Sequence, residues 1–134
     1  MQNGLPPATQ SQVTLIADNP ETLDGLQAYL AGVGVASRTT RVLRDAALIL
    51  PGSSALVLFP DDFALKDVER RLAFLRASRP ELLIVLVTSS PGRFRSALDR
   101  DDRCLSPVVL PKPAFGWVIL DAIRAHGRSK DPSW

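Results

Sequence analysis

Leu82-Leu83-Ile84-Val85-Leu86-Val87-Thr88-Ser89 is the stretch that decides the fold. Six apolar residues follow one another before the first hydroxyl side chain. A strand with one solvated face alternates apolar and polar residues, whereas a continuous apolar run is typical of a strand buried on both faces. Such strands belong to parallel sheets that carry helices on both sides. We therefore predict an α/β protein built around a parallel sheet.

Four more short segments are expected to be strands: residues 13–17, 35–39, 55–59 and 105–110. Polar residues in the segment 35–39 place that strand at an edge of the sheet. Segments with helical periodicity alternate with the strands, and residues 91–103 form a highly charged fourth one. The apolar stripes of the other four expected helices are Leu23, Leu26, Leu30 and Ala31; Val42, Leu43, Ala46, Ala47 and Leu50; Leu65, Val68, Leu72 and Leu75; and Phe115, Val118, Ile119, Ala122 and Ile123. Five strands alternating with five helices predict a doubly wound parallel sheet.

Length and composition indicate a single domain without disulfides. The 134 residues fit one domain, with a tail at 1–12, the domain at 13–126 and a polar tail at 127–134. The formal net charge of +2 gives no special reason to expect nucleic acid or a membrane as partner. The lone Cys104 cannot form an internal disulfide, and no apolar run approaches the length of a membrane span. These features predict a cytoplasmic protein.

Polar residues follow several of the expected strands. They are Asp18, Asp61, Asp62, Thr88 and Lys112, with Pro60 directly after the third strand. Ligand sites of doubly wound sheets lie at the carboxyl ends of the strands. Carboxylates there suit Mg²⁺, a lysine provides a point charge for phosphate, and a hydroxyl can donate to a phosphoryl oxygen.

Two motifs carry a family resemblance. Val109-Leu110-Pro111-Lys112-Pro113-Ala114-Phe115 looks like a lysine–proline signature after the last strand, and Leu86-Val87-Thr88-Ser89 like a switch hydroxyl followed by a small residue. In this order the chain resembles the receiver domains of bacterial response regulators over about residues 13–126. The resemblance implies a flavodoxin-like sheet with strand order 2-1-3-4-5 and a cis Lys112–Pro113 bond.

The same resemblance implies that part of the family's site has been lost. Ala17 stands where one of two metal-binding acids is expected, and Pro60 stands at the position of the phosphoacceptor aspartate. Val109 replaces the switch aromatic, while Thr88 and Lys112 are kept. The chain is thus expected to be a degenerate receiver, or pseudo-receiver, that lacks phosphotransfer chemistry and Mg²⁺.

Each retained residue has two interpretations. Lys112 can contact a phosphate or carboxylate ligand, or pair structurally with Asp18 or Asp61. Thr88 can be a switch hydroxyl, or a small residue that ends a strand and caps the next helix. Asp61 and Asp62 can supply a displaced phosphoacceptor, or favourable negative charge near a helix start.

Several residues are candidates for an interface. Four arginines crowd the expected fourth helix, where a solvated face with weak ion pairs is the alternative. Trp117 on the last helix is either part of the core or an anchor for a partner. The complete set of interface candidates is Arg93, Arg95, Arg100, Arg103, Val109 and Trp117.

We therefore predict a stand-alone atypical receiver-like signalling module, not an enzyme, that acts by protein–protein contact without phosphorylation. Its partner is a histidine kinase or other signalling protein, or a second copy bound through the fourth helix, last strand and last helix. One alternative is a receiver phosphorylated on Asp61 or Asp62 with Mg²⁺, for which Asp18 and Asp61 are weak ligand candidates. Another is a small-ligand sensor whose crevice is lined by Asp18, Thr88 and Lys112.

Overall fold

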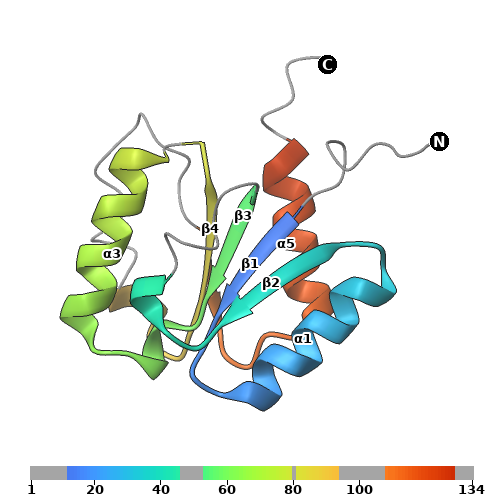
Figure 1. Cartoon of the computed structure of the whole chain (residues 1–134), viewed down its shortest axis with the longest axis horizontal. Helices are drawn as coiled ribbons and strands as arrows, with labels where there is room; N and C mark the ends of the chain where they lie inside the picture. Colours follow the sequence, from blue (N-terminus) through green and yellow to red (C-terminus); the bar gives the residue numbers. More distant parts are fainter. Residues whose placement is uncertain (1–11, 46–52, 80, 94–107, 129–134) are drawn as a thin grey trace.

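The computed structural model describes residues 12–45, 53–79, 81–93 and 108–128. Five strands form one sheet in the order β2-β1-β3-β4-β5, and every neighbouring pair is parallel, which confirms the predicted sheet and strand order (Figure 1). The strands are β1 (Gln12–Ile16), β2 (Ala36–Thr40), β3 (Ala55–Leu58), β4 (Leu83–Thr88) and β5 (Val108–Pro111). The helices are α1 (Pro20–Gly32), α3 (Leu65–Ser78) and α5 (Gly116–Arg128), with the short 3₁₀ turns η3 (Leu43–Asp45) and η4 (Pro60–Asp62).

Helices cover both faces of the sheet: α1 and α5 lie on one side and α3 on the other (Figure 1). Successive strand residues point to opposite faces of the sheet, so a central strand contributes side chains to the cores on both faces. The core under α1 and α5 contains Val13, Leu15, Ala55, Val57, Leu83, Val85 and Val87 from the strands. The core under α3 contains Ile16, Leu56, Leu58, Ile84 and Leu86 from the strands. Because both faces of the sheet are buried, the central strands consist of almost continuous apolar runs.

The strand register brings the carboxyl ends of the strands level with one another. Ile16 at the end of β1 is opposite Leu58 at the end of β3, and Leu58 is opposite Leu86 in β4. Thr88 is opposite Pro111. The segments that follow these strands therefore meet at one edge of the sheet, which is where the sequence placed the polar residues.

The edge position of β2 is confirmed, and none of its five residues is fully buried. Other expectations are met only in part, because 46–52 and 94–107 lie outside the described residues. Of the expected second helix, residues 43–45 are described and form the turn η3; of the expected fourth helix, residues 91–93 are described and are helical. The two predicted tails at 1–12 and 127–134 lie almost entirely outside the description. No helix in the described part of the chain is long and apolar enough to cross a membrane.

The predicted inner stripe of the last helix is confirmed only in part. Phe115 precedes α5 and is 61% exposed, and Val118 and Ala122 are half-buried. Among the described side chains of α5, Ile119, Leu120 and Ile123 are buried. The helix begins at Gly116, so Phe115 lies outside the helical repeat on which the predicted stripe was based.

Gly116, the first residue of α5, is expected to be intolerant of a side chain. A Cβ built there lies 2.8 Å from Cδ2 and 2.9 Å from Cγ of Tyr29, close to the base of that ring. Gly116→Ala should therefore lower the free energy of unfolding by about 1–3 kcal/mol through overpacking, measured by urea denaturation.

The matched control for this change is Gly25→Ala within α1. No atom lies within 4 Å of the added methyl group, and alanine favours a helix over glycine. The control should therefore raise stability by up to about 1 kcal/mol. Equal effects of the two substitutions would show that the contact between Tyr29 and Gly116 is not tight.

Candidate functional site

Asp61 lies at the centre of the polar groups on the strand-end edge. It belongs to η4, which turns the chain directly after β3. Its Oδ1 accepts a hydrogen bond from Thr88 Oγ1 at 2.5 Å, and its Oδ2 accepts from the backbone N and the Oγ of Ser89, both at 2.9 Å. Lys112 Nζ lies 3.5 Å from Oδ2. The carboxylate thus links the segment after β3 to the ends of β4 and β5.

The ends of β4 and β5 are also joined to each other. The backbone N of Lys112 donates to the carbonyl oxygen of Thr88 at 3.1 Å, and the Lys112–Pro113 peptide bond is cis, as the resemblance implied. Thr88 is fully buried, and its Oγ1 also accepts from the backbone N of Ser90. The Thr88 side chain therefore ends β4, bonds the next turn and contacts Asp61 at the same time.

The surroundings of Asp61 favour its ionised form. Burial raises the pKa of Asp61, but the hydrogen bonds from Ser89 N, Thr88 Oγ1 and Ser89 Oγ and the charge of Lys112 together lower it to about 2. The carboxylate is consequently negative at neutral pH. Its side chain is 24% exposed, so the crevice is open to solvent on one side.

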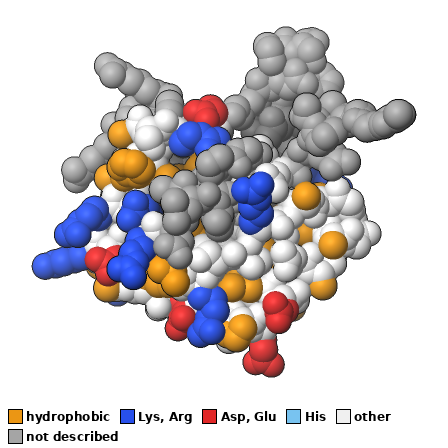
Figure 2. All heavy atoms as spheres, viewed as in Figure 1, with side chains coloured by type: hydrophobic (Ala, Val, Ile, Leu, Met, Phe, Trp, Pro, Cys, Tyr) orange, Lys and Arg blue, Asp and Glu red, His pale blue; other side chains and the backbone are white. Residues whose placement is uncertain are grey.

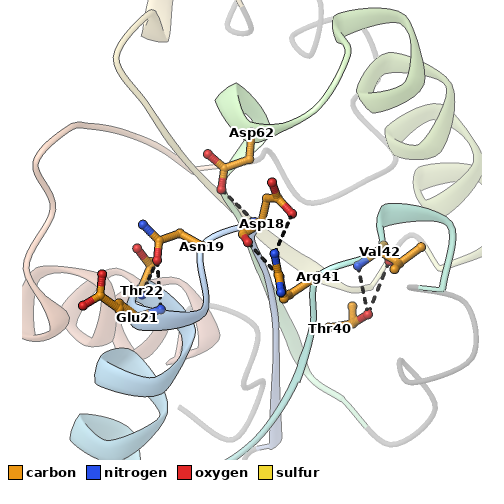
Figure 3. Close-up of polar contacts among 8 residues, drawn as sticks. All are labelled: Asp18, Asn19, Glu21, Thr22, Thr40, Arg41, Val42 and Asp62. Atoms are coloured by element: carbon orange, nitrogen blue, oxygen red, sulfur yellow. Dashed lines mark hydrogen bonds and ion pairs between the residues drawn. The ribbon is translucent and has the colours of Figure 1, made fainter.

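Asp18 makes contacts other than the predicted one with Lys112. Its carboxylate lies 3.5 Å from Arg41 Nη2, its carbonyl oxygen accepts from Arg41 Nε at 2.8 Å, and its backbone N donates to Asp62 Oδ2 at 2.8 Å (Figure 3). The predicted Asp18–Lys112 pair is therefore wrong, and Lys112 pairs with Asp61, the other partner that the sequence suggested. The reason is that Arg41, directly after β2, is nearer to Asp18.

The carboxylates of this edge are not arranged as a shared metal site. Asp61 is surrounded by donors, while the Asp18 and Asp62 carboxylates face Arg41 and a backbone N–H. No group of three or more His, Cys, Asp or Glu residues able to hold a metal ion is found within the described ranges. A cation at Asp61 would have to displace Ser89 and Lys112 from the same oxygen.

Solved structures of similar fold share this architecture. A response regulator receiver protein from Sinorhizobium medicae gives a TM-score of 0.76 at 14% identity, covering 92% of this chain and 99% of that one. The signal receiver domain of an HD domain-containing protein from Pseudomonas fluorescens gives 0.74 at 17% identity, covering 90% and 96%. An orphan response regulator of Helicobacter pylori gives 0.72 at 12% identity, covering 87% and 95%. The chain has the fold of response regulator receiver domains. No protein-family model and no curated protein matches the sequence.

Within this receiver fold, Pro60 follows the buried Phe59 and lies two residues after Leu58, the last residue of β3. It is buried and begins η4, and its ring has no group that could accept a phosphoryl group. Asp61 and not Pro60 is the residue whose side chain enters the crevice. The neighbouring Asp62 instead accepts a hydrogen bond from the backbone N of Asp18 (Figure 3).

The interface candidates are placed as follows. Val109 is half-buried and packs against the core under α3, and Trp117 is 58% exposed. Arg93 is exposed and lines a hollow of about 210 Å³ together with Asp61 and Ser89. The other three arginines of this set, Arg95, Arg100 and Arg103, lie outside the described residues.

Sequence reasoning missed two contributors to the site. Ser89 was treated only as a small residue, yet it gives Asp61 two hydrogen bonds. Arg41 was not considered, although a basic residue directly after β2 is the natural partner for Asp18 at the end of the adjacent strand. Both could have been found by asking which residues follow each strand in the order 2-1-3-4-5.

Proposed function

We propose that the protein is a cytoplasmic receiver-type signalling module that acts through contact with another protein and without being phosphorylated. The observation that carries this proposal is the position of the Asp61 carboxylate, which already occupies the donors of the crevice. On this proposal Asp61 holds the segments after β3, β4 and β5 together permanently, and the module is a binding protein and not an enzyme.

The chemistry of the crevice supports this role. A phosphoryl group is stabilised by hydroxyl, backbone N–H and ammonium donors, which are the groups that Asp61 engages here. With a pKa of about 2, Asp61 supplies a negative charge to them at neutral pH without any modification. Pro60, at the position where the resemblance places the phosphoacceptor, offers no nucleophile.

An exposed aromatic pair supports a contact with a protein. The rings of Phe115 and Trp117 are stacked, with centroids 6.4 Å apart and planes within 5°, and both are more than half exposed. Phe115 lies in the β5–α5 connection, three residues after Lys112, and Trp117 lies in the first turn of α5. Aromatic residues, Trp above all, are enriched in the energetic centres of interfaces. The partners we propose are a histidine kinase, another signalling protein or a second copy of this chain.

The displaced-acceptor function is the second candidate, because Asp61 does enter the crevice beside Lys112. An ionised carboxylate near a lysine could attack a phosphoryl donor if Mg²⁺ were bound. The two candidates make opposite predictions for the same experiment.

The proposal predicts that the intact mass of the protein stays unchanged after incubation with acetyl phosphate and millimolar Mg²⁺. A phosphorylatable receiver domain treated in parallel verifies the reagent, and Asp61→Asn is the matched variant. A stoichiometric phosphoryl adduct on the wild-type protein would overturn the proposal. Its loss in Asp61→Asn would identify Asp61 as the acceptor, and its persistence would point to another residue such as Asp62.

A further inference from the structure

A second hollow, separate from the crevice, lies between η3 and α3. Its volume is about 500 Å³, and four arginines line it: Arg41, Arg44, Arg70 and Arg71. Figure 2 shows Lys and Arg side chains gathered over α3, on the left of that view. This volume falls within the range of pockets that enclose a small organic molecule. The concentration of guanidinium groups in one concave site needs an explanation.

The charge of this hollow is not balanced by its own lining. Asp67 is the one carboxylate among the lining residues, so three positive charges are in excess. Arg44 and Arg70 are exposed and make no ion pair with any residue whose side chain the structure describes. Arg71 lies over the ring of Phe74, and it too makes no ion pair with any residue whose side chain the structure describes. Like charges held together repel each other, so an anion bound among them would be stabilised.

Apolar groups form the rest of the lining. The buried Leu43, which also packs in the core under α3, lines the hollow together with Val42, 41% exposed, and the half-buried Phe63. Apolar side chains would not stabilise a bare inorganic anion. The combination of guanidinium groups with an aromatic and two aliphatic side chains fits a ligand with an anionic end and an apolar or aromatic body.

We propose that this hollow binds a small phosphate-bearing organic molecule of about mononucleotide size. Guanidinium groups match phosphate oxygens with paired hydrogen bonds, and a phosphate monoester carries nearly two negative charges at pH 7. Phe63 is the group that would contact a planar or apolar body of the ligand. This site shares Phe63 with the hollow beside Asp61, but none of its four arginines lines that hollow, so its existence does not depend on how the crevice functions.

Arg41 belongs both to this hollow and to the strand-end edge. Its guanidinium group donates to the carbonyl oxygen of Asp18 and lies 3.5 Å from the Asp18 carboxylate (Figure 3). The Asp18 carboxylate therefore competes with a bound anion for Arg41. Removing that carboxylate should strengthen ligand binding about two- to fivefold, the range that corresponds to an exposed ion pair.

Isothermal titration calorimetry of the full chain with adenosine monophosphate tests the proposal, with inorganic phosphate, adenosine and poly-glutamate as comparison ligands. At low ionic strength we expect a Kd for the nucleotide below about 1 mM, at least about tenfold tighter than for either fragment. Asp18→Asn should tighten this binding. Arg44→Gln combined with Arg70→Gln should weaken it at least about tenfold, because two charge-assisted contacts are lost.

The matched control is Arg124→Gln, which removes an exposed arginine on α5, across the sheet. It should leave the affinity unchanged, and thermal melting should show all variants folded because the substituted arginines are exposed. Three results would each overturn the proposal: no nucleotide binding below about 1 mM, equal loss in the Arg124 variant, or binding of poly-glutamate as tight as that of the nucleotide. The last result would indicate a surface for acidic peptides instead.

Discussion

Asp61→Asn is expected to lower the free energy of unfolding by about 2 kcal/mol at pH 7. Three donors, from Thr88 and Ser89, converge on the two carboxylate oxygens. An asparagine keeps one acceptor oxygen but turns an NH₂ group toward donors, which leaves at least one of them unpaired. Urea denaturation should show a lower midpoint with an unchanged slope.

The loss should depend on pH in one direction. The folded pKa of Asp61, about 2, lies below the ordinary value of 3.8, so its ionisation stabilises the folded state above pH 4. That contribution disappears as the pH falls from about 4 to 2. The difference in stability between wild type and Asp61→Asn should therefore be constant from pH 5 to 8 and shrink by about 1–2 kcal/mol below pH 4, given the partial exposure of the side chain.

Two neighbouring substitutions serve as controls. Lys112→Gln should cost less than about 1 kcal/mol, because a partly exposed pair at 3.5 Å is weak. Asp62→Asn should also cost less than Asp61→Asn, since Asp62 is shown accepting one hydrogen bond, from the backbone of Asp18. If Lys112→Gln were as damaging as Asp61→Asn, the ion pair and not the hydrogen bonds would hold the crevice together.

The sheet could be predicted from the sequence because its strands are buried on both faces. The runs at residues 55–58 and 83–87 contain no polar residue, and that pattern has few structural explanations. The edge strand β2 was recognisable for the opposite reason, since Ser37, Arg38 and Thr39 are polar. Strands that helices cover on both faces can thus be recognised by their uninterrupted apolar sequence.

The crevice was less predictable because its contacts depend on turn geometry. The sequence showed that Asp61 follows the third strand, but not that η4 would direct Asp61 toward Thr88 and Asp62 toward Asp18. Adjacent residues in a 3₁₀ turn point in directions about 120° apart. A shift of one residue therefore exchanges the partners of the two carboxylates, and no periodicity in the sequence fixes that choice.

Leu58→Ala is expected to have the largest effect of the substitutions considered, lowering the free energy of unfolding by about 3–4 kcal/mol. Leu58 is the last residue of β3, is fully buried and lies in the core under α3. Its neighbours Ile16 and Leu86 on the adjacent strands are also fully buried, so the surrounding atoms cannot close the cavity. This loss is a large share of the roughly 5–15 kcal/mol that stabilises a domain.

Leu65→Ala is the matched control, because it removes the same atoms from the first residue of α3, where the side chain is 37% exposed. It should cost less than about 1 kcal/mol, since less apolar surface returns to water and no cavity forms. Both variants are compared by urea denaturation at pH 7. Similar losses would mean that Leu58 is not confined by its neighbours. A loss near the expected value would show that the core is tightly packed at the end of β3, the strand that η4 and Asp61 follow.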